Sequence, residues 1–409
     1  MKARKHTTWW LVIALCVAMV LVALAAVGCG GGEGSETTTS SIEGGTSGDP
    51  VVIGFAGGLT GDAAVGDVPA LQGMEYAVKV LNESGGIAGH PVKVIAKDMK
   101  SDVALGATVA NQLIDEGAQI IVGPAFPGFA AGVIQAATAA GVTVLGGTST
   151  QPEYTTIGGA KAYLVAFGDN VQAAAVAEYA LSKGYKTVYT VASPDLSYTA
   201  MLPVFFTEAF EKGGGKSIGT DNFTIGQPDF SAQVTKIAGL DPQPDCVYVP
   251  MFPPDVGIFL KQLRAAGVTA PVLGADGFDI QALLDLAGPD AEGVAFSTHG
   301  FPNPGSAVEQ WVKGYTEWKG SAPESSALGG LGADCIYVVK AAVEAAGSLD
   351  PKAIGEALAN LENIKVVTGT ITYKGTDGVP LKTVSIVTVK DGKFAFVEER
   401  IPEFVPAPR

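Results

Sequence analysis

The feature that most constrains the fold is a regular alternation of short apolar runs with stretches of helical periodicity, which starts at Val51. The run 51–55 is rich in β-branched residues and predicts a buried strand, and apolar residues recur at helical spacing over 69–82. The same order continues with strands predicted at 92–96, 120–123 and 142–145 and with helices predicted at 104–116 and 130–140. Alternation of this kind predicts a parallel sheet with helices on both faces.

The alternation then starts again in a second unit. Helices are predicted at 170–183, 197–212, 230–240 and 255–266, and strands at 187–192, 246–249 and 272–274. Three further helices, at 307–318, 327–346 and 351–361, precede a β-rich tail at 370–373, 383–388 and 394–397. The sequence therefore predicts an α/β fold of two units in series, and the length of the chain is sufficient for two domains, each with its own core.

Residues 1–50 have the pattern of an export signal followed by a tether. A basic start, an unbroken apolar run over 9–27 and small residues around Cys29 resemble the lipobox of bacterial lipoproteins, in which the cysteine thiol is acylated. This predicts a signal peptide at 1–28, lipidation of Cys29 and a flexible tether over 29–50. The alternative is an uncleaved membrane anchor, because the apolar run is nearly as long as the ~20 residues that span a bilayer. Both interpretations predict an extracytoplasmic protein attached to the cell membrane.

The charge of the chain argues against a nucleic-acid partner. The chain has 26 Lys and Arg residues against 41 Asp and Glu residues, and three of the basic residues belong to the predicted signal peptide. The mature chain would therefore carry a net charge of 23 − 41 = −18. A protein with this excess of negative charge repels phosphate backbones, so we expect no binding to nucleic acid.

Histidine and cysteine are too few for many metal and catalytic sites. Only His90 and His299 follow the predicted signal, so neither a His-rich metal site nor a Ser-His-Asp triad is expected. His299 precedes a Gly-Phe-Pro loop and is interpreted as a surface residue, with a position lining a hinge as the alternative. Cys246 and Cys335 lie in apolar patterns and are interpreted as buried free thiols, although an oxidising compartment would permit a disulfide between them.

Two glycine-rich segments mimic nucleotide-binding motifs without their spacing. The segment 213–217 ends like a P-loop, but Phe210 stands where the motif needs glycine and the segment follows a predicted helix. We interpret it as a glycine cap at the end of that helix, followed by a turn. The loop 57–61 lacks the spacing of a dinucleotide-binding loop, and the chain has no G-x-S-x-G motif. We therefore expect no cofactor and no enzymatic activity.

A series of individually weak motifs carries a family resemblance over residues 51–397. The motifs are Gly54–Gly61, Gln72–Gly73, Asn82–Gly89, Gly146–Glu153, Asp229–Ser231 and Gly274–Gly277. In this order they resemble the type I periplasmic solute-binding proteins of the branched-chain amino-acid class, which serve ABC importers. The resemblance implies two Rossmann-like lobes joined by three hinge crossings, with the ligand held between the lobes, where the carboxyl ends of the strands meet.

The resemblance also implies boundaries for the two lobes. Lobe 1 would comprise residues 51–167 and 299–370, and lobe 2 would comprise residues 168–298 and 380–405. The crossings would lie near 167–169, 297–303 and 370–378.

In lobe 1, the resemblance implies a site for the carboxylate of the ligand, formed by hydroxyls and by backbone amides at helix N-termini, where the helix dipole favours an anion. Thr150 matches a threonine that supplies a hydroxyl, although it could instead cap a turn, and Thr148 matches a residue that supplies backbone contacts. The family often has serines after the third strand, whereas this chain has an apolar segment that includes Pro127. Gly128 would still offer its amide there, and Phe126 would make this wall of the site more apolar.

In lobe 2, the acidic residue that pairs with the ammonium group of the ligand maps to Asp276. Asp276 could alternatively cap the short helix that follows, but Asp279 is better placed to do so. Tyr198 matches an aromatic wall residue, and Phe252 stands where a tyrosine is common.

The resemblance implies a small-molecule ligand, an ABC permease as partner, and a monomer without cofactor or metal. The apolar segment after the third strand leaves amino acids, amides and aromatic acids as candidate ligands. A ligand sensor that signals to a membrane receptor is the alternative function on the same fold.

Overall fold

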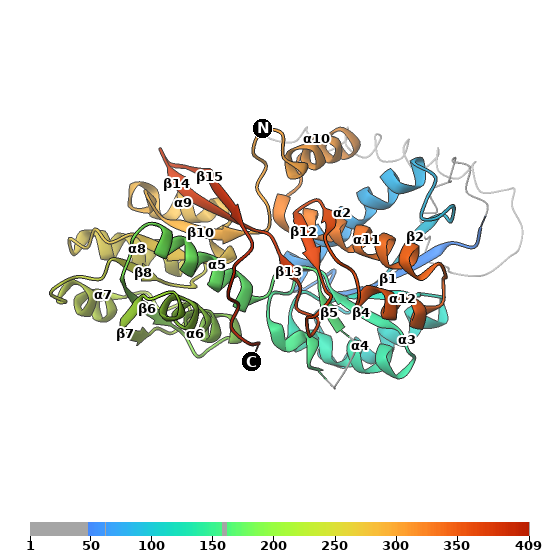
Figure 1. The fold of residues 1–409 in the computed structure, drawn as a ribbon, viewed down its shortest axis with the longest axis horizontal. Coiled ribbons are helices and arrows are strands. Elements are labelled where there is room, and N and C mark those ends of the chain that lie inside the picture. The colour runs from blue at the N-terminus through green and yellow to red at the C-terminus, as the bar shows by residue number, and fades with distance from the viewer. Residues whose placement is uncertain (1–47, 62, 158–161, 409) are drawn as a thin grey trace, which may run out of the picture. The chain divides into compact units, whose positions relative to one another are not determined.

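The fold is known from a computed structural model, which describes residues 48–61, 63–157 and 162–408. The predicted signal peptide, Cys29 and most of the predicted tether lie outside the described residues. The described residues form two α/β lobes, each built on its own sheet (Figure 1). The predicted fold class is confirmed.

Lobe 1 is built on a five-stranded parallel sheet with the strand order β2-β1-β3-β4-β5. Its strands are β1 (Val51–Gly57), β2 (Val92–Asp98), β3 (Ile120–Gly123), β4 (Thr143–Gly146) and β5 (Ala162–Leu164). Because successive side chains point to opposite faces of a sheet, Ile120 and Val122 belong to one core while Ile121 belongs to another. The sheet is thus buried on both faces, as its continuous apolar runs predict.

The helices of lobe 1 cover both faces of this sheet. On one side lie α2 (Ala64–Glu83), α10 (Ala307–Lys319), α11 (Ser326–Ala346) and α12 (Pro351–Leu358), whose apolar residues share one core. On the other side lie η1 (Val103–Leu105), α3 (Gly106–Asp115) and α4 (Pro127–Ala139), and the short helix η2 (Pro152–Thr155) precedes β5.

Helix α11 is the central helix of lobe 1. By length and composition α11 could cross a membrane, but 72% of its most apolar 18-residue stretch is buried inside the protein. It packs on α2 through glycines, since a Cβ atom on Gly73 would lie 1.9 Å from the carbonyl oxygen of Gly329. A Cβ atom on Gly332 would lie equally close, at 1.9 Å, to the carbonyl oxygen of Ala70. The apolar composition of α11 is therefore explained by its position in the core.

Lobe 2 is built on a seven-stranded sheet with the order β15-β14-β10-β9-β8-β6-β7. Its strands are β6 (Thr187–Ala192), β7 (Lys216–Asn222), β8 (Cys246–Tyr248), β9 (Val272–Gly274), β10 (Ala295–Thr298), β14 (Val384–Lys390) and β15 (Lys393–Arg400). The five strands from β6 to β10 pair in parallel, whereas β14 runs antiparallel to both β10 and β15. The β-rich tail predicted at the end of the chain thus extends the sheet of lobe 2.

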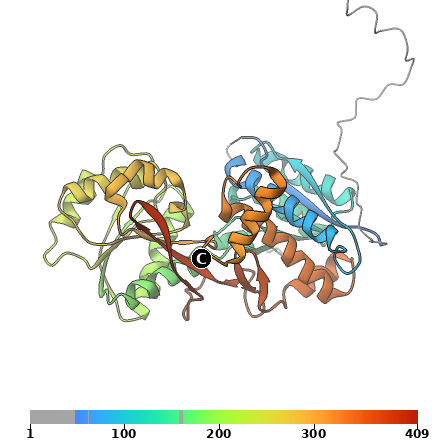
Figure 2. The ribbon, with the colours of Figure 1, turned by 90° about the horizontal axis from the view of Figure 1, so that it is seen from above.

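The helices of lobe 2 also lie on both faces of their sheet, which Figure 2 shows from a second direction. One core contains residues of α5 (Asp169–Ser182) and α6 (Ser197–Lys212). The opposite core contains residues of α7 (Ser231–Ala238), α8 (Asp255–Ala265), η4 (Asp276–Phe278), α9 (Gln281–Ala287) and η5 (Gly288–Ala291).

A small three-stranded sheet lies at the last passage between the lobes. It consists of β11 (Ile364–Val366), β12 (Gly369–Thr372) and β13 (Leu381–Lys382). β13 pairs with β12, and the chain joins the sheet of lobe 2 at Val384, where β14 begins. The other two passages lie between β5 and α5 and after β10.

Two interpretations of individual residues are confirmed. Cys246 and Cys335 are buried free thiols, and burial raises the pKa of Cys246 to about 12. The segment that mimics a P-loop ends α6, with Gly213 as the cap and Gly214 at φ 93°, and Lys216 already begins β7. It is therefore a turn between a helix and a strand.

Candidate functional site

The candidate residues of lobe 2 lie where parallel strands end. Asp276 follows β9, Phe252 follows β8, and Tyr198 lies in the first turn of α6, after β6. Ligands of open α/β sheets bind at the carboxyl ends of the strands, so these positions suit a binding site. The rings of Tyr198 and Phe252 stack with their centroids 4.8 Å apart. A Cβ atom on Gly277 would lie 2.8 Å from the Phe252 ring, so a glycine is needed for this close approach.

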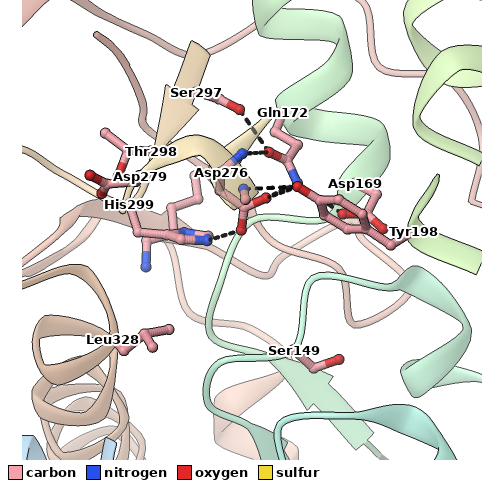
Figure 3. A network of polar contacts seen from close by, with 12 residues as sticks. Ser149, Asp169, Gln172, Tyr198, Asp276, Asp279, Ser297, Thr298, His299 and Leu328 are labelled. Carbon is pink, nitrogen blue, oxygen red and sulfur yellow. Dashed lines mark hydrogen bonds and ion pairs between the residues drawn. The ribbon is translucent and has the colours of Figure 1, made fainter. Parts of the chain in front are cut away.

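The carboxylate of Asp276 is the centre of a polar network (Figure 3). Its Oδ1 accepts hydrogen bonds from Gln172 Nε2 at 2.9 Å and from the hydroxyl of Tyr198 at 2.8 Å. Its Oδ2 lies 3.1 Å from Nε2 of His299. The side chain of Asp276 is 18% exposed, and an ionised carboxylate can accept more hydrogen bonds than these three contacts. These contacts hold the carboxylate in place and leave an edge for a further donor.

Gln172 connects Asp276 to its surroundings. Its Nε2 also donates to Asp169 Oδ1 at 2.9 Å, and its Oε1 accepts from the backbone N–H of Asp276 and from the hydroxyl of Ser297. Gln172 is fully buried in the first turn of α5. The backbone N–H of Asp169 in turn donates to the carbonyl oxygen of Thr150 at 2.7 Å. A continuous chain of hydrogen bonds therefore runs from Thr150 in lobe 1 to Asp276 in lobe 2.

The carboxylates of Asp169, Asp276 and Asp279 differ in the direction in which their surroundings shift the pKa. Burial raises the pKa of Asp169 well above its ordinary value and the charge of Asp276 adds to this, while hydrogen bonds from Gln172 and Thr150 oppose it. Burial likewise raises the pKa of Asp279 to about 6. For Asp276, burial also raises the pKa, but the hydrogen bond and charge of His299 and the bonds from Gln172 and Tyr198 outweigh it, so the pKa is lowered. Among these three carboxylates, Asp276 is the one whose pKa its environment lowers rather than raises.

His299 is buried, so its interpretation as a surface residue is wrong and the hinge-lining alternative fits. It is 3% exposed and follows β10, at the start of the second passage between the lobes. Its ring stacks on that of Phe167, which lies in the first passage, with centroids 3.7 Å apart. Burial lowers the pKa of His299, although the hydrogen bond and charge of Asp276 oppose this. The sequence offered no signal for this position, because a single histidine before a loop is usually exposed.

Asp279 does not cap α9, contrary to our prediction. The cap position is Ile280, without a side-chain hydrogen bond, and the carboxylate of Asp279 accepts a hydrogen bond from the hydroxyl of Thr298. The tertiary contact with β10 therefore takes the place of the local cap. Asp276 does not cap α9 either, which leaves its carboxylate available within the network.

The candidate residues of lobe 1 form a separate group at the ends of β3 and β4. A Cβ atom on Gly66 would lie 3.8 Å from Thr148 Oγ1 and 3.9 Å from the ring of Phe126, so these residues share one location. Phe126 is 40% exposed and immediately precedes α4, in which Gly128 is the second residue. Thr150 is buried, and its hydroxyl is used in part by Asp169.

Asp67 fixes the loops of this part of lobe 1. Its carboxylate accepts hydrogen bonds from the backbone N–H of Gly58 at 2.7 Å and of Ala125 at 2.8 Å. Burial raises the pKa of Asp67 to about 7, while the same two hydrogen bonds oppose this. Asp67 thereby joins the loops that follow β1 and β3, next to Phe126. Nothing in the local sequence distinguishes this aspartate from an ordinary residue in the first turn of a helix.

Within the described ranges, no group of three or more His, Cys, Asp or Glu side chains could hold a metal ion. The arrangement instead offers an ionised carboxylate with aromatic side chains in lobe 2, and hydroxyl and amide donors in lobe 1. These groups are suited to recognition of a small polar molecule.

Comparison with known proteins agrees with this geometry. A family model described as periplasmic binding protein matches residues 50–393. The chain belongs to the periplasmic binding protein family. The Leu/Ile/Val-binding protein homolog 3 of Brucella melitensis is 29% identical over 349 residues, which cover 85% of this chain and 94% of the relative. The Leu/Ile/Val-binding protein BraC3 of Rhizobium johnstonii is 27% identical, with 85% and 94% covered.

Solved structures of the family have the same fold. The crystal structure of a leucine-binding protein from Thermotoga maritima matches with a TM-score of 0.71 at 28% identity, covering 86% of this chain and 99% of the other. A branched-chain amino-acid transporter substrate-binding protein from Streptococcus pneumoniae, in complex with isoleucine, matches with a TM-score of 0.69 at 25% identity, covering 85% and 99%. This periplasmic binding protein therefore has the type I fold, and members of its family work outside the cytoplasm.

Proposed function

We propose that this periplasmic binding protein is the lipid-anchored receptor of an ABC importer and binds an α-amino acid between its lobes. The observation that carries the proposal is Asp276, a carboxylate at the end of β9 whose side chain is 18% exposed and whose pKa is lowered by His299, Gln172 and Tyr198. An ammonium group is the natural partner of such a carboxylate, because a buried charge needs an opposite charge and hydrogen bonds. The relatives named above, whose names refer to leucine, isoleucine and valine, support the same class of ligand.

The carboxylate of the amino acid would lie against lobe 1. Gly128 is in the first turn of α4, where backbone N–H groups and the helix dipole favour an anion, and the Thr148 hydroxyl is in the same group of residues. A ligand that contacts both lobes binds the closed arrangement more tightly than the open one and so shifts the equilibrium toward closure. The closed protein would then deliver the ligand to a permease.

An aromatic acid is the second candidate ligand. Phe126 is 40% exposed beside Thr148, and the segment after β3 offers Pro127 in place of a polar donor. A solute-binding protein of Rhodopseudomonas palustris, solved in complex with benzoate, shares the fold with a TM-score of 0.67 at 20% identity. In this case the aromatic wall of the site would contact the ring of the ligand.

Thermal unfolding of the full-length protein in detergent tests the proposal. We expect leucine, isoleucine, valine or phenylalanine to raise the unfolding midpoint, because a ligand at 100 times its Kd adds about 2.7 kcal/mol to the stability of the folded state. If benzoate alone raises the unfolding midpoint, the proposed ligand becomes an aromatic acid instead of an amino acid. The absence of any rise with these compounds and with acetamide would contradict the proposed ligand class.

The lipid anchor has its own test. We expect a clickable palmitate analogue supplied to the expressing bacteria to label the wild-type protein, and the substitution Cys29→Ser to abolish the label. Cys16→Ser is the matched control and should leave the label unchanged, since this cysteine lies within the apolar run. An unlabelled wild-type protein that stays in the membrane fraction would indicate an uncleaved anchor instead.

A further inference from the structure

We infer that His299 is a proton-linked positioning residue, which sets the charge of the Asp276 site and makes the binding of an ammonium ligand dependent on pH. The inference rests on the proposed function, because it concerns the group that would bind the ammonium. It starts from the geometry of the pair. His299 Nε2 lies 3.1 Å from Asp276 Oδ2, while Oδ1 of the same carboxylate is occupied by Gln172 and Tyr198.

The position of His299 is fixed from several sides. The stacking on Phe167 holds the imidazole at a centroid distance of 3.7 Å, and the residue is 3% exposed. Its Nδ1 is buried without a hydrogen-bond partner in the described part of the chain. A neutral imidazole that donates from Nε2 leaves Nδ1 as a bare acceptor, whereas a protonated ring would bury an unpaired N–H donor. The environment therefore accommodates the neutral ring better, and burial lowers the pKa of His299 accordingly.

The charge of the site follows from the state of this one ring. With neutral His299, Asp276 presents a full negative charge to a ligand ammonium. With protonated His299, the carboxylate already has a cationic partner, and the ammonium would have to enter a site of no net charge. Because like charges within a few ångströms repel each other, the ligand ammonium and the histidine proton compete for Asp276.

Other charged groups around His299 are either paired or hydrogen-bonded. The charge of Lys382 opposes protonation of His299 and that of Asp334 favours it, and these two groups are in contact with each other. Asp279 accepts from Thr298, and Asp169 is bonded to Gln172. Among these groups Asp279 also titrates in the relevant range, with a pKa of about 6, so it must be controlled for.

The test is the affinity for leucine between pH 7.5 and pH 5, measured by calorimetry on the full-length protein. We expect constant affinity while His299 is neutral, and a loss approaching tenfold per pH unit below the pKa of His299 in the ligand-free protein, which is lower than the ordinary value of about 6.5. Binding should release a proton in the acidic part of this range, and experiments in two buffers of different ionisation enthalpy would detect it.

Two substitutions separate His299 from its neighbours. His299→Gln keeps a nitrogen donor for Asp276 but cannot take up a proton, so its affinity for leucine should not fall with pH. Asp279→Asn is the matched control and should keep the pH dependence of the wild-type protein. If His299→Gln proves unstable, the wild-type protein is titrated with 4-methylpentanoate instead. This analogue of leucine has no ammonium, so its affinity should not fall as the pH falls.

The outcomes distinguish the inference from the proposed function. Leucine binding with the same pH dependence in the wild-type and His299→Gln proteins would overturn the role of His299 and leave the receptor for α-amino acids intact. A fall in leucine affinity with pH that is not accompanied by proton release would also overturn it. If the wild-type protein binds none of leucine, isoleucine, valine and phenylalanine, both the proposed function and the inference fail.

Discussion

Replacing Lys382 with methionine is expected to lower the free energy of unfolding by about 3–5 kcal/mol. The ammonium of Lys382 lies 2.9 Å from Asp334 Oδ2, and both side chains are 0% exposed. It also donates to the carbonyl oxygen of Val165 at 2.9 Å. The substitution would leave the carboxylate of Asp334 buried without its countercharge and would leave one acceptor of Val165 unpaired, and each loss is costly in a dry interior.

This ion pair is expected to matter more than any surface pair because of its position. Val165 precedes the first passage between the lobes, Lys382 ends β13, and Asp334 belongs to the central helix α11. The carboxylate of Asp334 additionally accepts from the backbone N–H groups of Val367 and Thr368, next to β12. The pair thus joins α11 to two of the chain segments that lead from one lobe to the other.

Urea unfolding of the variants would measure this contribution. The double substitution Lys382→Met and Asp334→Asn should recover much of the loss, because it removes both charges and retains an oxygen for the two backbone donors. Lys374→Met is the matched control. Lys374 is 59% exposed in its contact with Glu362, and its replacement should change the stability by less than about 1 kcal/mol. If Lys382→Met lowers the free energy of unfolding by less than about 1 kcal/mol, the proposed contribution of the buried pair to stability is contradicted.

The order of helices and strands was predictable because it has a local signature. The strands 120–123, 187–192 and 272–274 and the helix 197–212 begin and end where their apolar patterns predict. These elements are buried on one or both faces, so burial imposes a period of 2 or 3.6 on the sequence itself. Each of these segments therefore shows, in its own sequence, the apolar pattern that its burial requires.

Strands without such an apolar pattern were not predicted. β7 is an edge strand of mixed polar residues that are partly exposed, and no alternation of apolar residues marks it. β10 is fully buried, but it has only four residues and ends in Ser297 and Thr298. Its hydroxyls have partners in the polar network around Asp276 rather than in solvent. A short strand that serves a polar site does not look like a strand in the sequence.

Only those residues of the candidate site that the family resemblance maps onto this chain were predicted. The resemblance pointed to Asp276 and Tyr198, which the structure places in direct contact. It did not point to Gln172 or His299, which complete the contacts of the Asp276 carboxylate. Gln172 is separated from Asp276 by 104 positions, so no local spacing could have connected them.

Replacing Asp276 with asparagine is expected to weaken the binding of an α-amino acid by about 3–5 kcal/mol, or roughly 10²- to 10⁴-fold. The variant removes the countercharge of the ligand ammonium while the size of the side chain stays nearly the same. The asparagine oxygen can still accept from Gln172 or Tyr198, but its amide group would face the Nε2 donor of His299. The site would thus lose both its charge and one of its internal hydrogen bonds.

Calorimetric titration with leucine and with 4-methylpentanoate would separate loss of charge from loss of fold. Leucine should bind far more weakly to Asp276→Asn than to the wild-type protein, whereas 4-methylpentanoate, which has no ammonium, should lose little affinity. Asp279→Asn is the matched control, because this carboxylate is three residues away and already accepts a hydrogen bond from Thr298. Its affinity for leucine should stay within about threefold of the wild-type value. Equal affinity of the Asp276→Asn and wild-type proteins for leucine would remove Asp276 from the ammonium site, and the search for the anchor would then turn to lobe 1.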